Sequence, residues 1–150
     1  MNLYLNNLFN LKNKVAVVIG GGGHLCSEMV RAFAKSGCKV AILDLRIEKA
    51  KSIEEQLRAE GFSNLVSMQL DVSNKADHQK CLKDIVNKFD SIDILVNGAG
   101  INGSTPFLDL TIEEWDNIMN SQIKGTFLGC QVFGEFMLKV GDKAPEFTLL

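Results

Sequence analysis

The sequence lacks several features that mark specialised classes of protein. Its 16 Lys and Arg residues are outnumbered by 18 Asp and Glu and form no concentrated basic face, so the formal charge of −2 argues against nucleic-acid binding. The first fourteen residues have no basic start followed by an apolar block, which argues against a signal peptide. The most apolar later stretch, residues 123–140, is interrupted by Lys124, Glu135 and Lys139, so no membrane span is expected.

Cysteine spacing excludes a further kind of site. No pair among Cys26, Cys38, Cys81 and Cys130 has the Cys-x-x-Cys spacing, so we expect no zinc or other metal site. Reduced thiols in a cytoplasmic protein are the simpler interpretation.

What is present is the composition of one globular domain: 150 residues, 46% hydrophobic and 23% charged. Short apolar runs predict buried strands over residues 15–19, 40–43, 65–70 and 92–96. Helical stripes predict four helices, from Leu25 to a stop at Gly37, from Ile47 to near Gly61, from an N-cap at Ser73 through Phe89, and from a capping box at Thr111 and Glu114 toward Met137. The last helix is expected to be long and largely buried. This alternation implies a Rossmann-type, doubly wound α/β fold with a parallel sheet, whose ligand site lies at the carboxyl ends of the strands.

Four consecutive glycines, from Gly20 to Gly23, separate the first predicted strand from the first predicted helix. In a dinucleotide fold this is the position where backbone N–H groups and the helix dipole meet a pyrophosphate. A purely structural tight turn is the alternative. We favour phosphate binding because the strand before the run and the helix after it are both predicted.

Asp44 closes the second predicted strand, slightly more than twenty residues after Gly20. A carboxylate there can accept hydrogen bonds from the adenosine ribose hydroxyls and would repel a 2′-phosphate. NAD is therefore favoured over NADP, although Arg46 offers an alternative partner for that phosphate. The other interpretation is that Asp44 only caps a loop.

Together these residues resemble the short-chain dehydrogenase/reductase family. The resemblance is carried by Gly20 and its neighbours, Asp44, the Asp71-Val72 pair and Asn97-Gly98-Ala99-Gly100, and it runs from about Leu11 to about Leu138. It implies that Asp71 meets the adenine ring, with Val72 beside it. It also implies that Asn97, Ala99 and Gly100 steady the central strand and line the cofactor cleft. By itself the Asn-x-Ala-Gly motif is also typical of a simple strand-ending turn.

The glycine loop departs from the family pattern Thr-Gly-x-x-x-Gly-x-Gly. His24 and Cys26 replace its last two glycines. A Cβ at His24 would crowd the pyrophosphate and the sulfur of Cys26 would hold the helix off the strand, unless the four glycines reshape the turn. We expect Gly20, Gly22, Gly23, His24 and Leu25 to contribute to cofactor binding, with a solvent-facing His24 as the alternative. The loop is similar to a variant in family members that act on sugar acids such as mannonate.

The family's catalytic residues are largely missing. Gln122 stands where the family has a catalytic Asn, one methylene longer than that residue. The only tyrosine, Tyr4, precedes the first strand and has Leu8 rather than Lys four residues later, so the Tyr-x-x-x-Lys pair is absent. Without it there is no phenol to move the substrate proton and no ammonium to lower the pKa of that phenol.

Residues 139–150 resemble the opening of a peroxiredoxin but contain no cysteine, and we interpret them as a foreign or fused tail after a partial Rossmann domain over residues 1–138. A domain truncated after its fourth strand and the following long helix would expose an apolar sheet edge. That edge favours self-association, such as a homo-oligomer, and marginal stability.

Two functional hypotheses follow. The first is an NAD-dependent oxidoreductase by descent, which moves hydride between NAD and a carbonyl or secondary alcohol and is inactive as this chain alone. The second is a catalytically silent nucleotide-binding or interaction module. A fusion that docks to a thiol-dependent partner has only the tail in its favour.

Overall fold

The computed structural model describes residues 10–140, which form one α/β sandwich around a four-stranded sheet. The strands β1 (Val15–Ile19), β2 (Lys39–Asp44), β3 (Leu65–Gln69) and β4 (Ile94–Asn97) are all parallel, in the order β3-β2-β1-β4. The chain first moves from β1 outward to β3 and then crosses back to place β4 on the other side of β1. The predicted doubly wound α/β fold is thereby confirmed.

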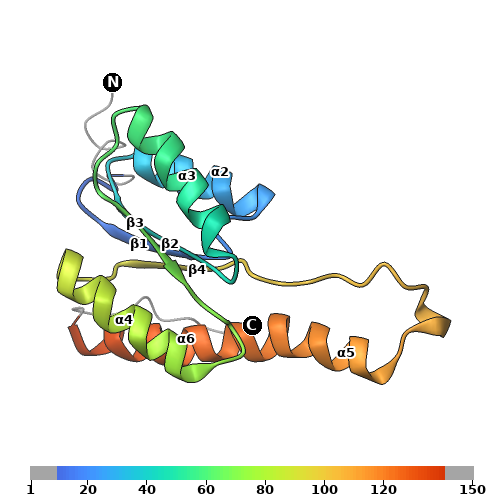
Figure 1. The fold of residues 1–150 in the computed structure, drawn as a ribbon. Coiled ribbons are helices and arrows are strands. Elements are labelled where there is room, and N and C mark those ends of the chain that lie inside the picture. Colours follow the sequence, from blue (N-terminus) through green and yellow to red (C-terminus); the bar gives the residue numbers. More distant parts are fainter. Residues whose placement is uncertain (1–9, 141–150) are drawn as a thin grey trace.

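Helices cover both faces of the sheet. The helices α2 (His24–Lys35) and α3 (Ile47–Ala59) lie on one face, and α4 (Lys75–Phe89) and α6 (Gly125–Val140) lie on the other (Figure 1). Because both faces are covered, the central strands can be apolar at every position, and all five residues of β1 are buried.

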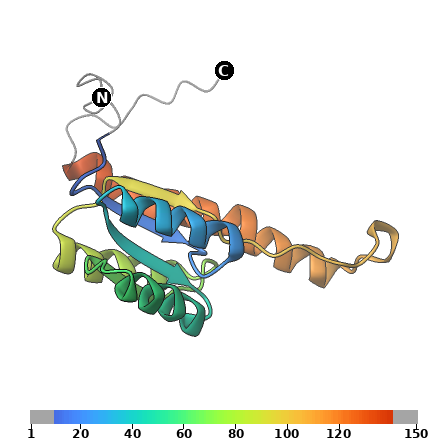
Figure 2. The same cartoon turned by 90° about the horizontal axis from the view of Figure 1, so that it is seen from above.

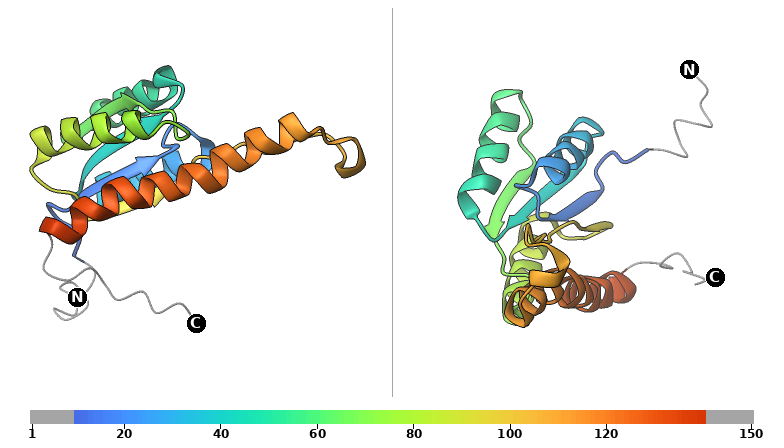
Figure 3. Two further views of the ribbon diagram at one scale, coloured as in Figure 1. Left: turned by 90° about the horizontal axis from the view of Figure 1, so that it is seen from below. Right: turned by 90° about the vertical axis from the view of Figure 1, so that its right-hand side faces the viewer.

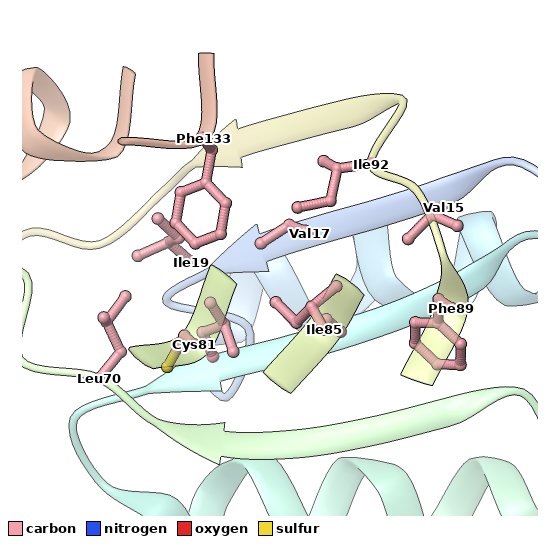
Figure 4. Close-up of a cluster of buried hydrophobic side chains, with 11 residues drawn as sticks. Val15, Val17, Ile19, Leu70, Cys81, Ile85, Phe89, Ile92 and Phe133 are labelled. Atoms are coloured by element: carbon pink, nitrogen blue, oxygen red, sulfur yellow. The ribbon is translucent and has the colours of Figure 1, made fainter. Parts of the chain in front are cut away.

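Alternate side chains of β1 pack into two separate hydrophobic cores. Val15, Val17 and Ile19 pack under α4 and α6 with Ile85 and Phe133 (Figure 4). Ala16 and Val18 pack on the opposite face, against residues of α2 and α3. This period of two is the geometry of a pleated strand, so the two cores hold the carboxyl end of β1, and the turn that follows it, in one position.

The helical segment after β4 extends beyond the hydrophobic core. A short 3₁₀ turn, η1 (Phe107–Asp109), is followed by α5 (Ile112–Met119), the π-helical η2 (Asn120–Lys124) and α6. The loop after β4 runs outward from the sheet, and the chain then returns beside this loop as α5, so that α5 projects beyond the sheet (Figures 2 and 3). The prediction of a largely buried helix is wrong for this part, because α5 has no buried residue while α6 has five. Among the helices of residues 10–140, none combines the length and the apolar character that a bilayer crossing requires.

Several boundaries differ from the prediction. The N-cap of α4 is Asn74 rather than Ser73, because the Asn74 side chain accepts a hydrogen bond from the Ala76 N–H. The strand β4 begins at Ile94 rather than at position 92, since its pairing with β1 starts opposite Ala16. The capping box is confirmed on one side, where the Thr111 hydroxyl accepts from the Glu114 N–H.

Two expectations about the end of the chain stay predictions. The helix α6 runs through Val140, and the rest of the proposed tail lies outside the described residues. Within the described range β4 is an edge strand, as predicted, but no observation tests whether that edge drives self-association.

Candidate functional site

A cavity of about 650 Å³ opens at the carboxyl ends of the strands. It lies where the strand order reverses, between β1 and β4, which is the usual ligand position in an open parallel sheet. Its walls come from the loops after all four strands and from the start of the long helical segment. The predicted residues that line it are Gly20, Gly23, Asp44, Asp71, Val72, Ala99 and Gly100.

The glycine run forms a turn whose own N–H groups are already used. Gly20 and Gly21 donate to the Leu43 carbonyl oxygen, at 2.7 and 2.9 Å, and Gly23 donates to the Gly20 carbonyl at 2.9 Å. Gly20 has φ +80°, and a Cβ there would lie 2.8 Å from the Ala99 nitrogen, so both conformation and space require glycine. The run therefore places the turn against the exit of β4 and does not itself offer free donors.

Free donors lie one step later, in the first turn of α2. Within residues 10–140, the N–H groups of His24, Leu25 and Cys26 have no hydrogen-bond acceptor, and the N-cap residue Gly23 has no side chain to supply one. These amides carry the positive end of the helix dipole. The N-cap residue Gly23 lines the cavity, whereas His24 and Leu25 do not, and the side chains of these two residues are exposed.

Asp44 is held at the end of β2 by two backbone contacts. It is 8% exposed, and its carboxylate accepts hydrogen bonds from the Gly22 N–H at 3.1 Å and the Arg46 N–H at 3.0 Å. Gly22 lies behind this carboxylate rather than on the cavity wall, and a Cβ on Gly22 would lie 2.9 Å from Asp44 Oδ2. A carboxylate has about four acceptor sites, so Asp44 can accept further hydrogen bonds from a ligand.

The loop after β3 forms another wall. Asp71 Oδ1 accepts hydrogen bonds from the Ser73 N–H at 2.9 Å and the Ser73 hydroxyl at 2.7 Å, which fixes its orientation. Val72 packs against the first residue of α6, Gly125, where a Cβ would lie 2.9 Å from Val72 Cβ. The start of α6 thereby holds this loop at the cavity.

Gln122 lies outside this cavity, in a second hollow of about 430 Å³ that it shares with Asn97, Ala99 and Gly100. Its side-chain amide donates to the Ile101 carbonyl oxygen at 2.8 Å and to Asn102 Oδ1 at 3.1 Å. It sits in the π-helical η2, an irregularity that is frequent at functional sites. In this arrangement the Gln122 side chain fastens the loop after β4.

Asn97 connects β4 to α6. Its Nδ2 donates to Cys130 Sγ at 3.3 Å, while its buried Oδ1 has no hydrogen-bond partner among the described residues. The approach is close, because a Cβ on Gly129 of α6 would overlap this oxygen. Asn97 thus borders the second hollow and does not line the first cavity.

The helical segment after β4 adds three polar residues to the cavity that were not predicted as site residues. Asn117, Asn120 and Ser121 line it from α5 and η2. Their spacing of three and then one residue puts them on a single helical face, which is the signal that could have identified them. Leu45, Ile101 and Ser73 also line the cavity, which has no Tyr, Lys or His side chain in its lining within residues 10–140.

One thiol lies close to the site. Burial raises the pKa of Cys26, and the negative charge of Asp44 raises it further. The thiol is therefore neutral near pH 7 and a poor nucleophile. No group of three or more His, Cys, Asp or Glu side chains within residues 10–140 is arranged to hold a metal ion.

Comparison with known proteins gives a consistent result. A family model described as short chain dehydrogenase matches residues 14–144. A D-threitol dehydrogenase from Mycolicibacterium smegmatis is 33% identical over 136 residues, which are 91% of this chain and 52% of the relative. A 2-dehydro-3-deoxy-D-gluconate 5-dehydrogenase from Dickeya dadantii is 32% identical over 135 residues, 90% of this chain and 52% of the relative.

Solved structures agree with these matches. A short chain dehydrogenase/reductase from Burkholderia phymatum in complex with NAD superposes with a TM-score of 0.82 and 25% identity, over 87% of this chain and 46% of that one. The chain spans about half the length of the curated relatives it matches.

Proposed function

Because the chain belongs to the short chain dehydrogenase family, we propose that it binds NAD in the 650 Å³ cavity and supplies the cofactor site of an oxidoreductase. The observation that carries the proposal is the pairing of free first-turn amides on α2 with a buried carboxylate, Asp44, across one turn. Hydrogen-bond donors for an anion and a carboxylate that accepts from hydroxyl groups, both beside one cavity, match a diphosphate joined to a ribose.

Each part of the dinucleotide has residues that fit it. We assign the pyrophosphate to the N–H groups of His24 and Leu25, which follow Gly20 and Gly23 in the chain. Because Gly22 has no Cβ, it leaves room for the Asp44 carboxylate. Asp44 takes the adenosine ribose hydroxyls. Asp71, oriented by Ser73, and Val72 take the adenine ring. Ala99 and Gly100 line the continuation of the cleft, and Asn97 supports it from β4.

NAD is preferred over NADP in this proposal. The 8% exposed Asp44 carboxylate would lie beside a 2′-phosphate and repel it. Arg46 also lines the cavity and is the one basic residue that the described part of the chain contributes to its lining. It follows Asp44 by two residues, so it can reduce this discrimination without reversing it.

The reaction proposed for the protein to which this site belongs is hydride transfer between NAD and a carbonyl or secondary alcohol. That chemistry is supplied by the nicotinamide when bound, and the protein positions it. A sugar acid or polyol is the substrate class we favour, because the variant glycine loop resembles that of sugar-acid enzymes and two relatives are named for such substrates. In this proposal Gln122 holds the loop after β4 in position, because its side-chain amide donates a hydrogen bond to the Ile101 carbonyl oxygen.

A second function, a nucleotide-binding module without turnover, is favoured by one observation. The lining of the cavity within residues 10–140 has no Tyr, Lys or His side chain, and its two carboxylates, Asp44 and Asp71, already accept hydrogen bonds from neighbouring N–H and hydroxyl groups. Both functions require the same NAD site, and they differ only in turnover.

The test is calorimetric titration of the chain with NAD and with NADP. Gly20→Ala should weaken NAD binding by about tenfold or more, because its φ of +80° and the Ala99 nitrogen both oppose a Cβ. Gly61→Ala is the matched control, since Gly61 has φ +98° but no neighbour within 4 Å of a Cβ. If folded wild-type chain shows no heat with saturating NAD and no rise in melting temperature, the proposal is wrong.

A further inference from the structure

The contact between α2 and the exit of β4 has an unusual composition. In a dinucleotide fold the third glycine of the loop allows the helix to approach the strand closely. Here Cys26 occupies that position, is 6% exposed, and directs its thiol at Gly98, whose carbonyl oxygen lies 3.7 Å from Sγ.

Gly98 is glycine for reasons of space alone. Its φ is not positive, so its backbone would accept other residues. A Cβ on Gly98, however, would overlap Cys26 Sγ. The missing side chain on the strand side is therefore what admits the extra sulfur on the helix side.

The same contact borders the cavity. Gly98 donates from its N–H to the Ile19 carbonyl oxygen at 3.0 Å and lines the 650 Å³ cavity. The next residue, Ala99, contacts Gly20 at the start of the glycine turn. A shift between Cys26 and Gly98 would consequently move the first-turn amides of α2 relative to the cavity.

We infer that Cys26 and Gly98 are a complementary pair of positioning residues that sets the distance between the phosphate-facing end of α2 and the exit of β4. The glycine that allows the close approach stands just after β4 instead of in α2, and the space it leaves holds the Cys26 sulfur. The inference rests on the proposed NAD site for its effect on ligand binding, but the pairing itself does not.

The experiment is a double-mutant cycle on the whole chain. Gly98→Ala alone should weaken NAD binding by about tenfold, and Cys26→Ala alone by less than about threefold. In the double variant the two methyl carbons would be 3.8 Å apart, an ordinary van der Waals distance, while the new Cβ would still lie 3.3 Å from the Ile19 carbonyl oxygen. Most of the NAD affinity lost in Gly98→Ala should therefore return.

The control replaces a different buried thiol. Cys38 is 4% exposed and contacts the Leu11 carbonyl oxygen, far from Gly98, so Cys38→Ala combined with Gly98→Ala should give additive effects and no recovery. If Gly98→Ala fails to fold, recovery of folding in Cys26→Ala/Gly98→Ala but not in Cys38→Ala/Gly98→Ala supports the pair.

Two failures can be told apart. If wild type binds NAD but Gly98→Ala binds equally well, or the double variant binds no better than Gly98→Ala, the pairing is refuted while the NAD site stands. If wild type binds no dinucleotide, the proposed function is refuted, and urea unfolding of the same four proteins decides the pairing. Additive changes in unfolding free energy would then overturn it.

Discussion

Asp44 gives the sharpest test of the cofactor site, because its structural and ligand-binding roles can be separated. Its two oxygens accept the Gly22 and Arg46 N–H groups in the folded chain. Asp44→Asn keeps the size and one acceptor oxygen but turns an amide NH₂ toward one of these donors. That loss should lower the free energy of unfolding by about 1–3 kcal/mol, and Asp44→Ala, which loses both acceptors, by roughly twice as much.

The charge has a separate effect on cofactor choice. Two like charges about 4 Å apart repel by about 1 kcal/mol in bulk water and by about 4 kcal/mol at an effective dielectric constant of about 20. Asp44 is only 8% exposed, so the repulsion should exceed the lower end of this range. Removing the charge in Asp44→Asn should raise the affinity for NADP relative to NAD by about tenfold or more.

The ratio of the two affinities is the informative quantity. Any rearrangement of the glycine turn in Asp44→Asn weakens both dinucleotides, whereas only NADP carries the 2′-phosphate. Calorimetric titrations of wild type and Asp44→Asn with each dinucleotide, below the melting temperature of both proteins, supply the four dissociation constants. An unchanged ratio in folded Asp44→Asn would refute the placement of the ribose at Asp44.

Two further predictions concern the scaffold. Phe133→Ala, which removes a fully buried ring between α6 and the sheet, should lower the free energy of unfolding by about 3–5 kcal/mol, whereas Phe127→Ala on the same helix, where the ring is 58% exposed, should change it by less than about 0.5 kcal/mol in urea titrations. Burial acts to raise the pKa of Asp93, but hydrogen bonds from Lys14 Nζ and the Val15 N–H more than offset this and lower it. A carboxyl whose pKa is lowered in the folded state stabilises the fold at pH values above its ordinary pKa, and this stabilisation is lost as the pH falls through the lowered value. The free energy of unfolding should therefore decrease below about pH 4. The decrease should be smaller in Asp93→Asn, which has no carboxyl at this position.

The central strands β1 and β2 were predictable because they are buried on both faces. A run such as residues 15–19 has to be apolar at every position when helices cover both sides, and this leaves a clear mark in the sequence. The exposure of α5 was not predictable in the same way. Its apolar residues, including Ile112 and Trp115, have helical spacing typical of a buried stripe, yet they are 77% and 45% exposed, since α5 projects beyond the sheet.

Motif spacing located the cavity but did not show which acceptors the glycine N–H groups bond to. The glycine run predicts a phosphate-binding turn, and that turn does lie at the cavity. Its N–H groups, however, donate to the Leu43 and Gly20 carbonyl oxygens and to the Asp44 carboxylate. The bonds to Leu43 and Asp44 form only because β2 lies next to β1. A pattern within eight residues cannot contain this information, because the acceptors are up to about twenty residues away in the chain.

The same limit applies to Cys26, one of the two residues that depart from the family loop pattern. Considered alone, Cys26 predicts a helix held away from the strand, and the sequence gives no reason to connect it with Gly98, 72 residues later. Asn97 and Gly129 form a comparable pair across β4 and α6, where the amide oxygen fills the space of a missing side chain. In both pairs a glycine is required by the size of its neighbour and not by its own φ, so neither glycine belongs to a turn that local sequence could reveal. A substitution in such a contact should therefore be judged against the residue across the contact, since the space that one side chain needs is supplied by the other.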